Sequence, residues 1–214
     1  MTEPMTMNRL IHAAVRRDLD RLSAALEKLP ENDRARAQEL QRAFANLRRE
    51  LTQHHEGEDT YIWPMLSKLG VDPDLLATME AEHHAMAGAL AETDTAMAAL
   101  ARTGSAADAA AARASVVRTR EVVERHLRHE EDELEPQLMP HMESAEWKAV
   151  EKKLRSQPLG IVGRFFAWLT DGMSEENRAF LKKTVPTPVV TLLARTFGRR
   201  YYKDVAPTWR SPTS

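Results

Sequence analysis

Four long segments with helical periodicity constrain the fold of this chain more than any other feature. In each segment apolar residues recur at alternating spacings of three and four, which places them along one face of an α-helix. The segments span about 7–29, 32–63, 73–104 and 106–135. Because the connections between them are short, consecutive helices should run antiparallel. The pattern predicts an all-α protein built on an up-down-up-down four-helix bundle with additional C-terminal helices.

Proline and capping residues indicate where these helices begin and end. Pro30 should break the first helix and Pro64 should stop the second. Asp72 followed by Pro73 is a strong start signal for the third helix, because aspartate caps the first turn and proline fits its first position. The fourth helix is predicted to start at a cap formed by Ser105 or Asp108 and to close at Pro136 and Pro140.

The sequence pattern changes after the fourth helix, where the long helical segments end. We expect a bundle domain at residues 1–142 and a C-terminal helical extension at residues 143–214, loose from about residue 207. Four aromatic residues of the extension need cover, so we expect it to pack on the bundle or on a second subunit: Phe165, Phe166, Trp168 and Phe180. A homodimer through these helices follows as a hypothesis.

Composition limits the partners and the chemistry. The formal net charge is -2, so no global basic field indicates a nucleic-acid partner. The sequence lacks a secretory signal pattern and a membrane-spanning apolar run, so we expect a cytoplasmic protein with no membrane partner. The chain contains 0 cysteines, which excludes disulfides and thiolate metal sites. Any transition metal must therefore be held by imidazole and carboxylate groups.

An internal repeat carries the candidate chemistry. His54 is followed by Glu58 and Pro64, and His126 is followed at the same spacings by Glu130 and Pro136. Residues four apart lie on one face of a helix, so each pair directs two ligand-type side chains the same way. Both pairs lie on the face that apolar residues occupy elsewhere in the helix, where polar groups are costly unless they are paired or bound to metal.

The other two bundle helices each offer a histidine at the same level. His12 lies near the start of the first helix and His83 lies early in the third. In an antiparallel bundle, the starts of these two helices lie beside the ends of the second and fourth. All six side chains should therefore meet at one end of the core.

Four imidazoles and two carboxylates without sulfur suit iron, manganese or zinc. Six ligands from four helices would crowd a single ion, so we predict two ions with Glu58 and Glu130 as bridges. Tyr61 and Trp63, which flank the first pair, are interpreted as packing residues.

These residues resemble the hemerythrin-like, HHE cation-binding family. The resemblance covers roughly residues 7–140 and rests on His12 together with three stretches: HHEGEDTYIWPML, EHHAM and HLRHEEDELEP. It implies two iron ions bridged by carboxylates and by an oxo or hydroxo group, with manganese or zinc as alternatives. It further implies a small diatomic or peroxide ligand: oxygen, hydrogen peroxide or nitric oxide.

The third helix departs from the oxygen carriers of that family, which place two histidines there one turn apart. Here Met79 and Ala87 flank His83 at that spacing, and His84 is its neighbour in sequence and an alternative ligand. A missing imidazole would leave an open coordination position, which favours reaction with small oxidants over reversible oxygen carriage. His55 and the neighbouring acidic residues are expected to lie outside the ligand set or to face solvent.

Three functions remain open on this basis. The first is a di-iron protein that senses or binds oxygen or nitric oxide, or that defends against oxidants. The second is a haem-free, catalase-like enzyme that consumes peroxide or nitric oxide. The third is a metal-free helical scaffold for a partner. The same cage of side chains would serve the first two, so the sequence does not separate them.

Overall fold

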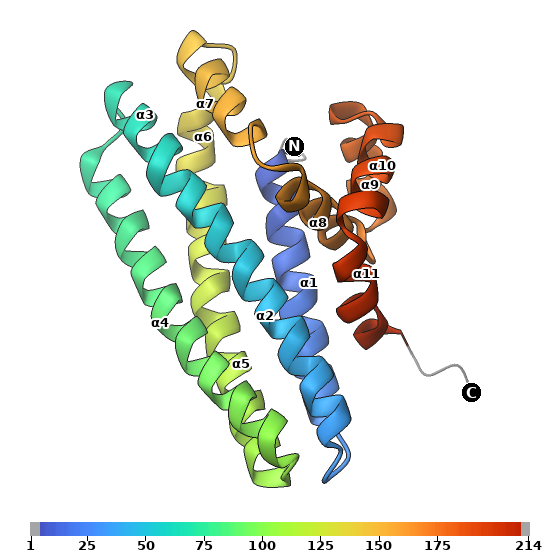
Figure 1. Ribbon diagram of the computed structural model, residues 1–214. Coiled ribbons are helices and arrows are strands. Elements are labelled where there is room, and N and C mark those ends of the chain that lie inside the picture. The colour runs from blue at the N-terminus through green and yellow to red at the C-terminus, as the bar shows by residue number, and fades with distance from the viewer. Residues whose placement is uncertain (1–4, 211–214) are drawn as a thin grey trace.

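The computed structural model describes residues 5–210, and its core is a four-helix bundle (Figure 1). The bundle helices are α1 (Met7–Glu27), α2 (Arg34–Gly57), α4 (Pro73–Thr103) and α5 (Ala106–His129). Helix α1 packs against α2 and α5, and α4 packs against the same two neighbours, so the four helices form a closed square. The described part of the chain is helical with no strand, which confirms the all-α prediction.

Each bundle helix begins at a polar N-cap. The side chains of Thr6, Asp33, Asp72 and Ser105 accept hydrogen bonds from backbone N–H groups of the following turn. Such caps satisfy donors that have no partner inside the helix. Helix α4 ends at Gly104, whose φ of 69° lies in the left-handed region that favours glycine. The predicted start at Asp72 and the cap at Ser105 are confirmed.

Leucine dominates the interior of the bundle. The largest fully buried aliphatic and aromatic side chains include residues from α1 and α2 at the predicted spacing: Leu10, Leu19, Leu22, Leu40, Phe44, Leu47 and Leu51. Burial of one such side chain stabilises the fold by roughly 1.5–3 kcal/mol. Polar residues interrupt this apolar seam at two levels: a hydrogen-bonded group of Thr93, Ser115 and Thr119 midway along α4 and α5, and a cluster of histidines and glutamates near the start of α1. Figure 1 shows that end of the bundle, where the chain begins.

The second helix does not stop at Pro64, and that prediction is wrong. The fourth passes Pro136, the first of its two predicted closing prolines, and its last α-helical residue is Leu138, before Pro140. Helix α2 continues through the π-helical turn η1 (Glu58–Ile62) into α3 (Trp63–Lys68), and α5 continues through η2 (Glu130–Leu134) into α6 (Glu135–Leu138) and the short 3-10 turn η3 (Met139–His141). In each π-turn a backbone N–H reaches back five residues, from Trp63 to Glu58 and from Glu135 to Glu130. Proline then occupies the first positions of the next helix, where it needs no N–H partner.

The extension packs on the bundle, which is one of its two expected positions. Its elements are α7 (Ala145–Arg155), α8 (Leu159–Thr170), α9 (Glu175–Thr184), α10 (Thr187–Phe197), α11 (Arg199–Asp204) and the 3-10 turn η4 (Ala206–Trp209). Helix α7 lies against α3 and η1, while α8 lies against α1 and α11 against α2 (Figure 1). None of the helices in residues 5–210 is long and apolar enough to cross a membrane.

A buried carboxylate anchors α8 to α1. Asp18 is 1% exposed and accepts a hydrogen bond of 2.8 Å from the indole nitrogen of Trp168. The neighbouring Arg17 pairs with Asp18 and donates to the carbonyl oxygens of Trp168 and Leu169 at the end of α8. A cation at a helix C-terminus satisfies carbonyls that the helix leaves unpaired. The extension is therefore fixed to the helix that carries His12.

The last described residues are also packed. Thr208 in η4 is 2% exposed, and its carbonyl accepts a hydrogen bond of 2.8 Å from Arg36. This differs from the expectation of a loose tail from about residue 207, because a local turn and a bundle arginine hold the backbone. Residues 211–214 lie outside the described residues.

Candidate metal centre

The structure brings the six residues predicted from the sequence into one closed ring of contacts at the end of the bundle. His12 Nε2 lies 3.4 Å from His54 Nε2 and 3.2 Å from Glu130 Oε2. Around the rest of the ring, His54 Nε2 lies 3.2 Å from Glu58 Oε1, and Glu58 Oε2 lies 3.6 Å from His83 Nε2. His83 Nε2 lies 3.2 Å from His126 Nε2, which lies 3.8 Å from Glu130 Oε2.

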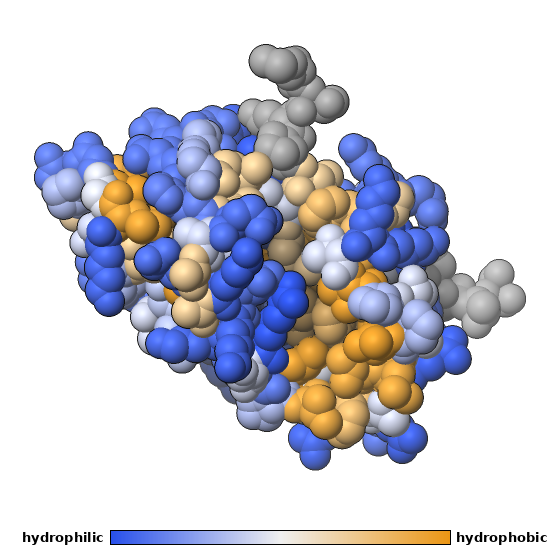
Figure 2. All heavy atoms as spheres, turned by 90° about the horizontal axis from the view of Figure 1, so that it is seen from above, coloured by the Kyte–Doolittle hydropathy of each residue, from blue (hydrophilic) through white to orange (hydrophobic). Residues whose placement is uncertain are grey.

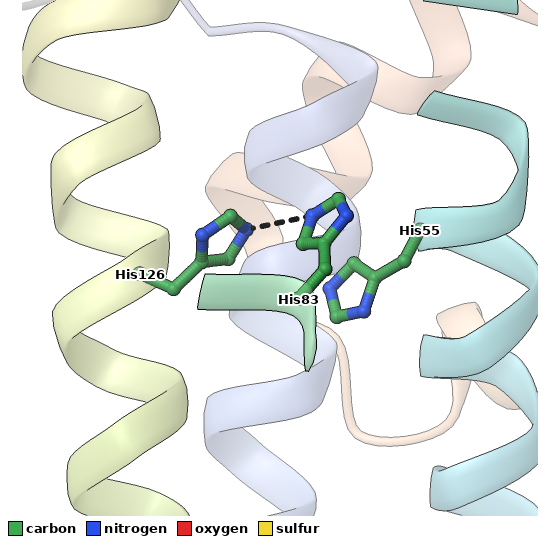
Figure 3. Close-up of side chains that lie close together, drawn as sticks. All are labelled: His55, His83 and His126. Carbon is green, nitrogen blue, oxygen red and sulfur yellow. Dashed lines mark hydrogen bonds between the residues drawn. The ribbon is translucent and has the colours of Figure 1, made fainter. Parts of the chain in front are cut away.

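A seventh side chain, His55, lies beside this ring and does not face solvent, which was one of its two expected positions. His55 is 7% exposed and stacks on His83 with ring centroids 4.1 Å apart. Figure 3 shows the rings of His55, His83 and His126 converging from α2, α4 and α5. His84, the alternative to His83, is exposed and hydrogen-bonds the Glu80 carbonyl instead.

The ligand-type atoms divide into two groups. One group is His12, His54 and Glu130, and the other is His55, His83 and His126; within each, the candidate atoms lie within 4.8 Å of one another. Glu58 lies within 4 Å of a histidine from each group, and so does Glu130. The two carboxylates therefore lie where they could bridge two ions.

Outer carboxylates fix the orientation of three imidazoles. Asp59 lies 2.8 Å from Nδ1 of His83, and Glu131 lies 2.7 Å from Nδ1 of His12. Glu82 reaches Nδ1 of His126 at 3.0 Å. A carboxylate at Nδ1 keeps the proton on that nitrogen and leaves the Nε2 lone pair free for a metal. All three Nε2 atoms face the interior of the ring.

Several inward atoms lack a partner. His55 Nε2 and Glu58 Oε2 are buried without a hydrogen-bond partner among the described residues. Glu130 Oε2 likewise has no partner in hydrogen-bond geometry within residues 5–210, although it lies close to His12. Buried acceptors without donors are costly, and a cation between them removes that cost. The donor set thus fits a metal: imidazole and carboxylate, with acceptors directed to a common centre.

The pKa values of the metal-free centre show how strongly these groups interact. Burial alone lowers the pKa of His12, but the carboxylates of Glu130 and Glu131 beside the imidazole outweigh it and raise that pKa to about 9. Burial, followed by the charge of His12, lowers the pKa of His54 to about 3. Burial and the charge of Glu130 hold the pKa of Glu58 well above its usual value. Without metal the centre keeps extra protons on His12 and Glu58.

Three further pKa shifts follow from burial and the same charges. Burial would raise the pKa of Glu130, yet the His12 imidazole close to its carboxylate, through contact and charge, lowers it. Burial opposes a similar shift at Glu131, where hydrogen bonds from His12 and Arg16 lower the pKa to about 2. Burial, followed by the charge of His54, lowers the pKa of His55 well below its usual value. His55 is thus neutral, the form that binds metal.

Both π-turns begin at the glutamates of the ring. Glu58 is the first residue of η1 and Glu130 the first of η2, so the internal repeat of the sequence is also a repeat of backbone structure. π-turns inside α-helices frequently occur at functional sites. Here the prolines at 64 and 136 are the only sequence signal for them, since each removes an N–H from the regular ladder.

Comparison with known proteins agrees with this site. The family described as the Hemerythrin HHE cation binding domain matches residues 7–138, which covers the four bundle helices and both π-turns. No curated protein matches the chain, and no solved structure does. Because the match spans more than half of the chain and includes every residue of the ring, the chain belongs to the hemerythrin HHE cation-binding family.

Proposed function

We propose that this protein holds two iron ions in the ring and binds or reacts with oxygen, hydrogen peroxide or nitric oxide. One observation carries the proposal: two groups of ligand-type atoms lie on either side of two glutamates. Three of these buried atoms, His55 Nε2, Glu58 Oε2 and Glu130 Oε2, have no hydrogen-bond donor among the described residues. Carboxylate-bridged pairs of iron ions in bundle cores are held by this kind of donor set.

The ligands would divide between the ions as the two groups do. His12 and His54 would bind one ion, and His55, His83 and His126 would bind the other. Glu58 and Glu130 would bind both ions, because each lies near a histidine of either group. Five imidazoles and two carboxylates without sulfur favour iron, with manganese and zinc as the alternatives.

His55 changes the expectation of an open position. The missing second histidine on the third helix was expected to leave one ion short of a ligand, but His55 supplies an imidazole to the same group. The other group, His12 with His54, offers only two imidazoles. An ion held there would therefore have the more open coordination position. Exogenous ligands should bind there.

Burial favours a small ligand. The side chains of His12, His83, His126 and the two glutamates are 0–5% exposed, and His54 is 9% exposed. A ligand reaching the centre must therefore be small, as oxygen, nitric oxide and peroxide are. Bound iron would supply the change of oxidation state and the coordination position that such ligands need.

Turnover distinguishes binding from catalysis. Iron-loaded protein should be mixed with peroxide or nitric oxide under single-turnover and multiple-turnover conditions. Consumption over many cycles that the His54→Ala variant loses would indicate an enzyme, whereas one stoichiometric spectral change would indicate a sensor or carrier. The exposed His84→Ala variant is the matched control and should behave as the unmodified protein does. No spectral change with any of these ligands would contradict the proposal.

A further inference from the structure

The exposed large apolar side chains of residues 5–210 all lie on two helices of the C-terminal extension. They are Leu159 in α8, with 55% exposed, and three residues of α10: Val189 at 44%, Leu192 at 64% and Phe197 at 45%. We call these four residues the apolar face. Figure 2 shows a connected hydrophobic area over this part of the molecule, with hydrophilic side chains at its border.

The apolar face is continuous because α8 and α10 touch through their backbones. A Cβ atom at Gly163 would lie 2.4 Å from the Cβ atom of Phe197, and one at Gly198 would lie 2.6 Å from the carbonyl oxygen of Gly163. Leu159 precedes Gly163 by one helical turn, so it lies on the side of α8 that faces α10. The two helices thus form a closely packed pair, of which α8 lies against α1 of the bundle.

The sequence around the apolar face is basic and lacks acids. Residues 178–203 contain no Asp or Glu and hold seven cations: Arg178, Lys182, Lys183, Arg195, Arg199, Arg200 and Lys203. All but Arg178 are exposed. Arg195 follows Leu192 by one helical turn, which places a guanidinium beside the most exposed leucine. The chain as a whole has a formal net charge of -2, so this excess of positive charge is local.

We propose that the apolar face is a peripheral docking surface for a bilayer that contains anionic lipids. Leucine, valine and phenylalanine side chains gain by entering the boundary between headgroups and acyl chains. The surrounding cations are attracted to lipid phosphates, at a gain that falls away within a Debye length. The combination of exposed aliphatic side chains with an acid-free basic segment is the chemistry that such a surface recognises.

Two other occupants of the apolar face, a second copy of the chain and a nucleic acid, fit it less well. A second copy seated symmetrically on the apolar face would bring two sets of like charges together, which opposes pairing. A nucleic acid would satisfy the cations but would offer little to Leu159 and Leu192, because its binding relies on phosphate contacts and on stacking against aromatic rings.

The test is flotation of the full chain with vesicles of phosphatidylcholine, with or without phosphatidylglycerol. Binding is expected only when phosphatidylglycerol is present. The double variant Leu192→Ser with Phe197→Ser should lower the partition coefficient by a factor on the order of ten or more, because it removes two inserted apolar groups. Both residues are exposed, so thermal melting followed by circular dichroism should show an unchanged fold.

A second variant tests the charges. It replaces three cations of the acid-free segment with glutamine: Arg195, Arg199 and Arg200. The loss should be on the order of 100-fold at low salt. The control variant makes the same change at three exposed cations of the bundle: Arg42, Arg102 and Arg118. Because it alters net charge equally at a distant surface, it should bind vesicles as the unmodified protein does.

Four results would overturn the proposal. The first is absence of binding to either vesicle, and the second is equal binding to both. The third is anionic binding that the Leu192 and Phe197 replacements leave unchanged, since charge alone would then explain it. The fourth is a dimer in light scattering that these replacements dissociate, because a second copy would then cover the apolar face.

Discussion

His83 and His126 face each other across the centre with their Nε2 atoms 3.2 Å apart (Figure 3). Each imidazole has a carboxylate at Nδ1, Asp59 for His83 and Glu82 for His126. Two Nδ1-protonated imidazoles would present lone pairs to each other at this distance, which is unfavourable unless a cation lies between them. This relationship is the strongest local argument that the centre binds metal.

Replacement of His55 should weaken metal binding. His55→Ala removes one imidazole from the group that includes His83 and His126, so affinity for one ion should fall on the order of tenfold or more. His84→Ala removes an exposed imidazole from the next helix and should change nothing. Metal content per chain after dialysis against a weak chelator measures the difference. Equal metal retention in the two variants would show that His55 is not a ligand.

Glu82 should act as a positioning residue for His126. Its carboxylate lies 3.0 Å from Nδ1 of His126 and 3.0 Å from Nδ1 of His129, so it links a ring imidazole to a partly exposed one. Glu82→Gln should lower metal affinity about 10–100-fold, a typical cost for losing such a partner. Glu80→Gln is the control, because Glu80 lies two residues before Glu82 on the same helix and is exposed. Competition with a chelating dye measures affinity, and unchanged affinity in Glu82→Gln would contradict this role.

The metal-free protein should lose stability as pH rises. The pKa of His12 is raised from 6.5 to about 9 in the folded chain, so its contribution is fully present below pH 6.5 and is lost as pH rises through about 9. Urea unfolding of metal-free protein across this range measures the slope. His12→Gln should flatten it, and metal loading should also flatten it because an ion replaces the proton. A stability that increases between pH 6.5 and 9 would contradict the assignment.

Loss of the Asp18–Trp168 hydrogen bond should loosen the extension. Trp168→Phe leaves a buried carboxylate without its indole donor, which should lower the free energy of unfolding by about 1.5–3 kcal/mol. Trp209→Phe is a matched control, because the indole nitrogen of Trp209 has no hydrogen-bond partner within the described residues. Urea denaturation compares the two variants. A cost for Trp168→Phe no larger than that of the control would show that this bond adds little.

Sequence periodicity was sufficient for the bundle and for six members of the ring, but it misplaced His55. After Leu51, a helix of 3.6 residues per turn can direct either the third or the fourth following residue inward. The third is His54 and the fourth is His55, and the structure directs both into the centre. The spacing of the apolar residues alone favoured His54 as the inward residue. The internal repeat reinforced that choice, because its second copy has Leu127 in place of a second histidine.

The continuation of the helices past Pro64 and Pro136 could not be predicted from the periodicity of the sequence either. A proline normally ends a helix because it lacks an N–H and collides with the preceding turn. The π-turns η1 and η2 widen that turn, and their stability depends on tertiary contacts, such as the packing of α7 against η1. Glu82 was missed for a different reason: its partners lie on α5, more than forty residues away, and no local pattern relates them.

The most direct test of the account is the iron content of the aerobically purified protein together with its absorption spectrum. The account predicts about two irons per chain, since the two groups of ligands share their carboxylates. It also predicts ferric charge-transfer bands that shift on addition of azide or peroxide. A protein without metal and with a featureless spectrum, even after anaerobic loading with ferrous iron, would contradict the central claim.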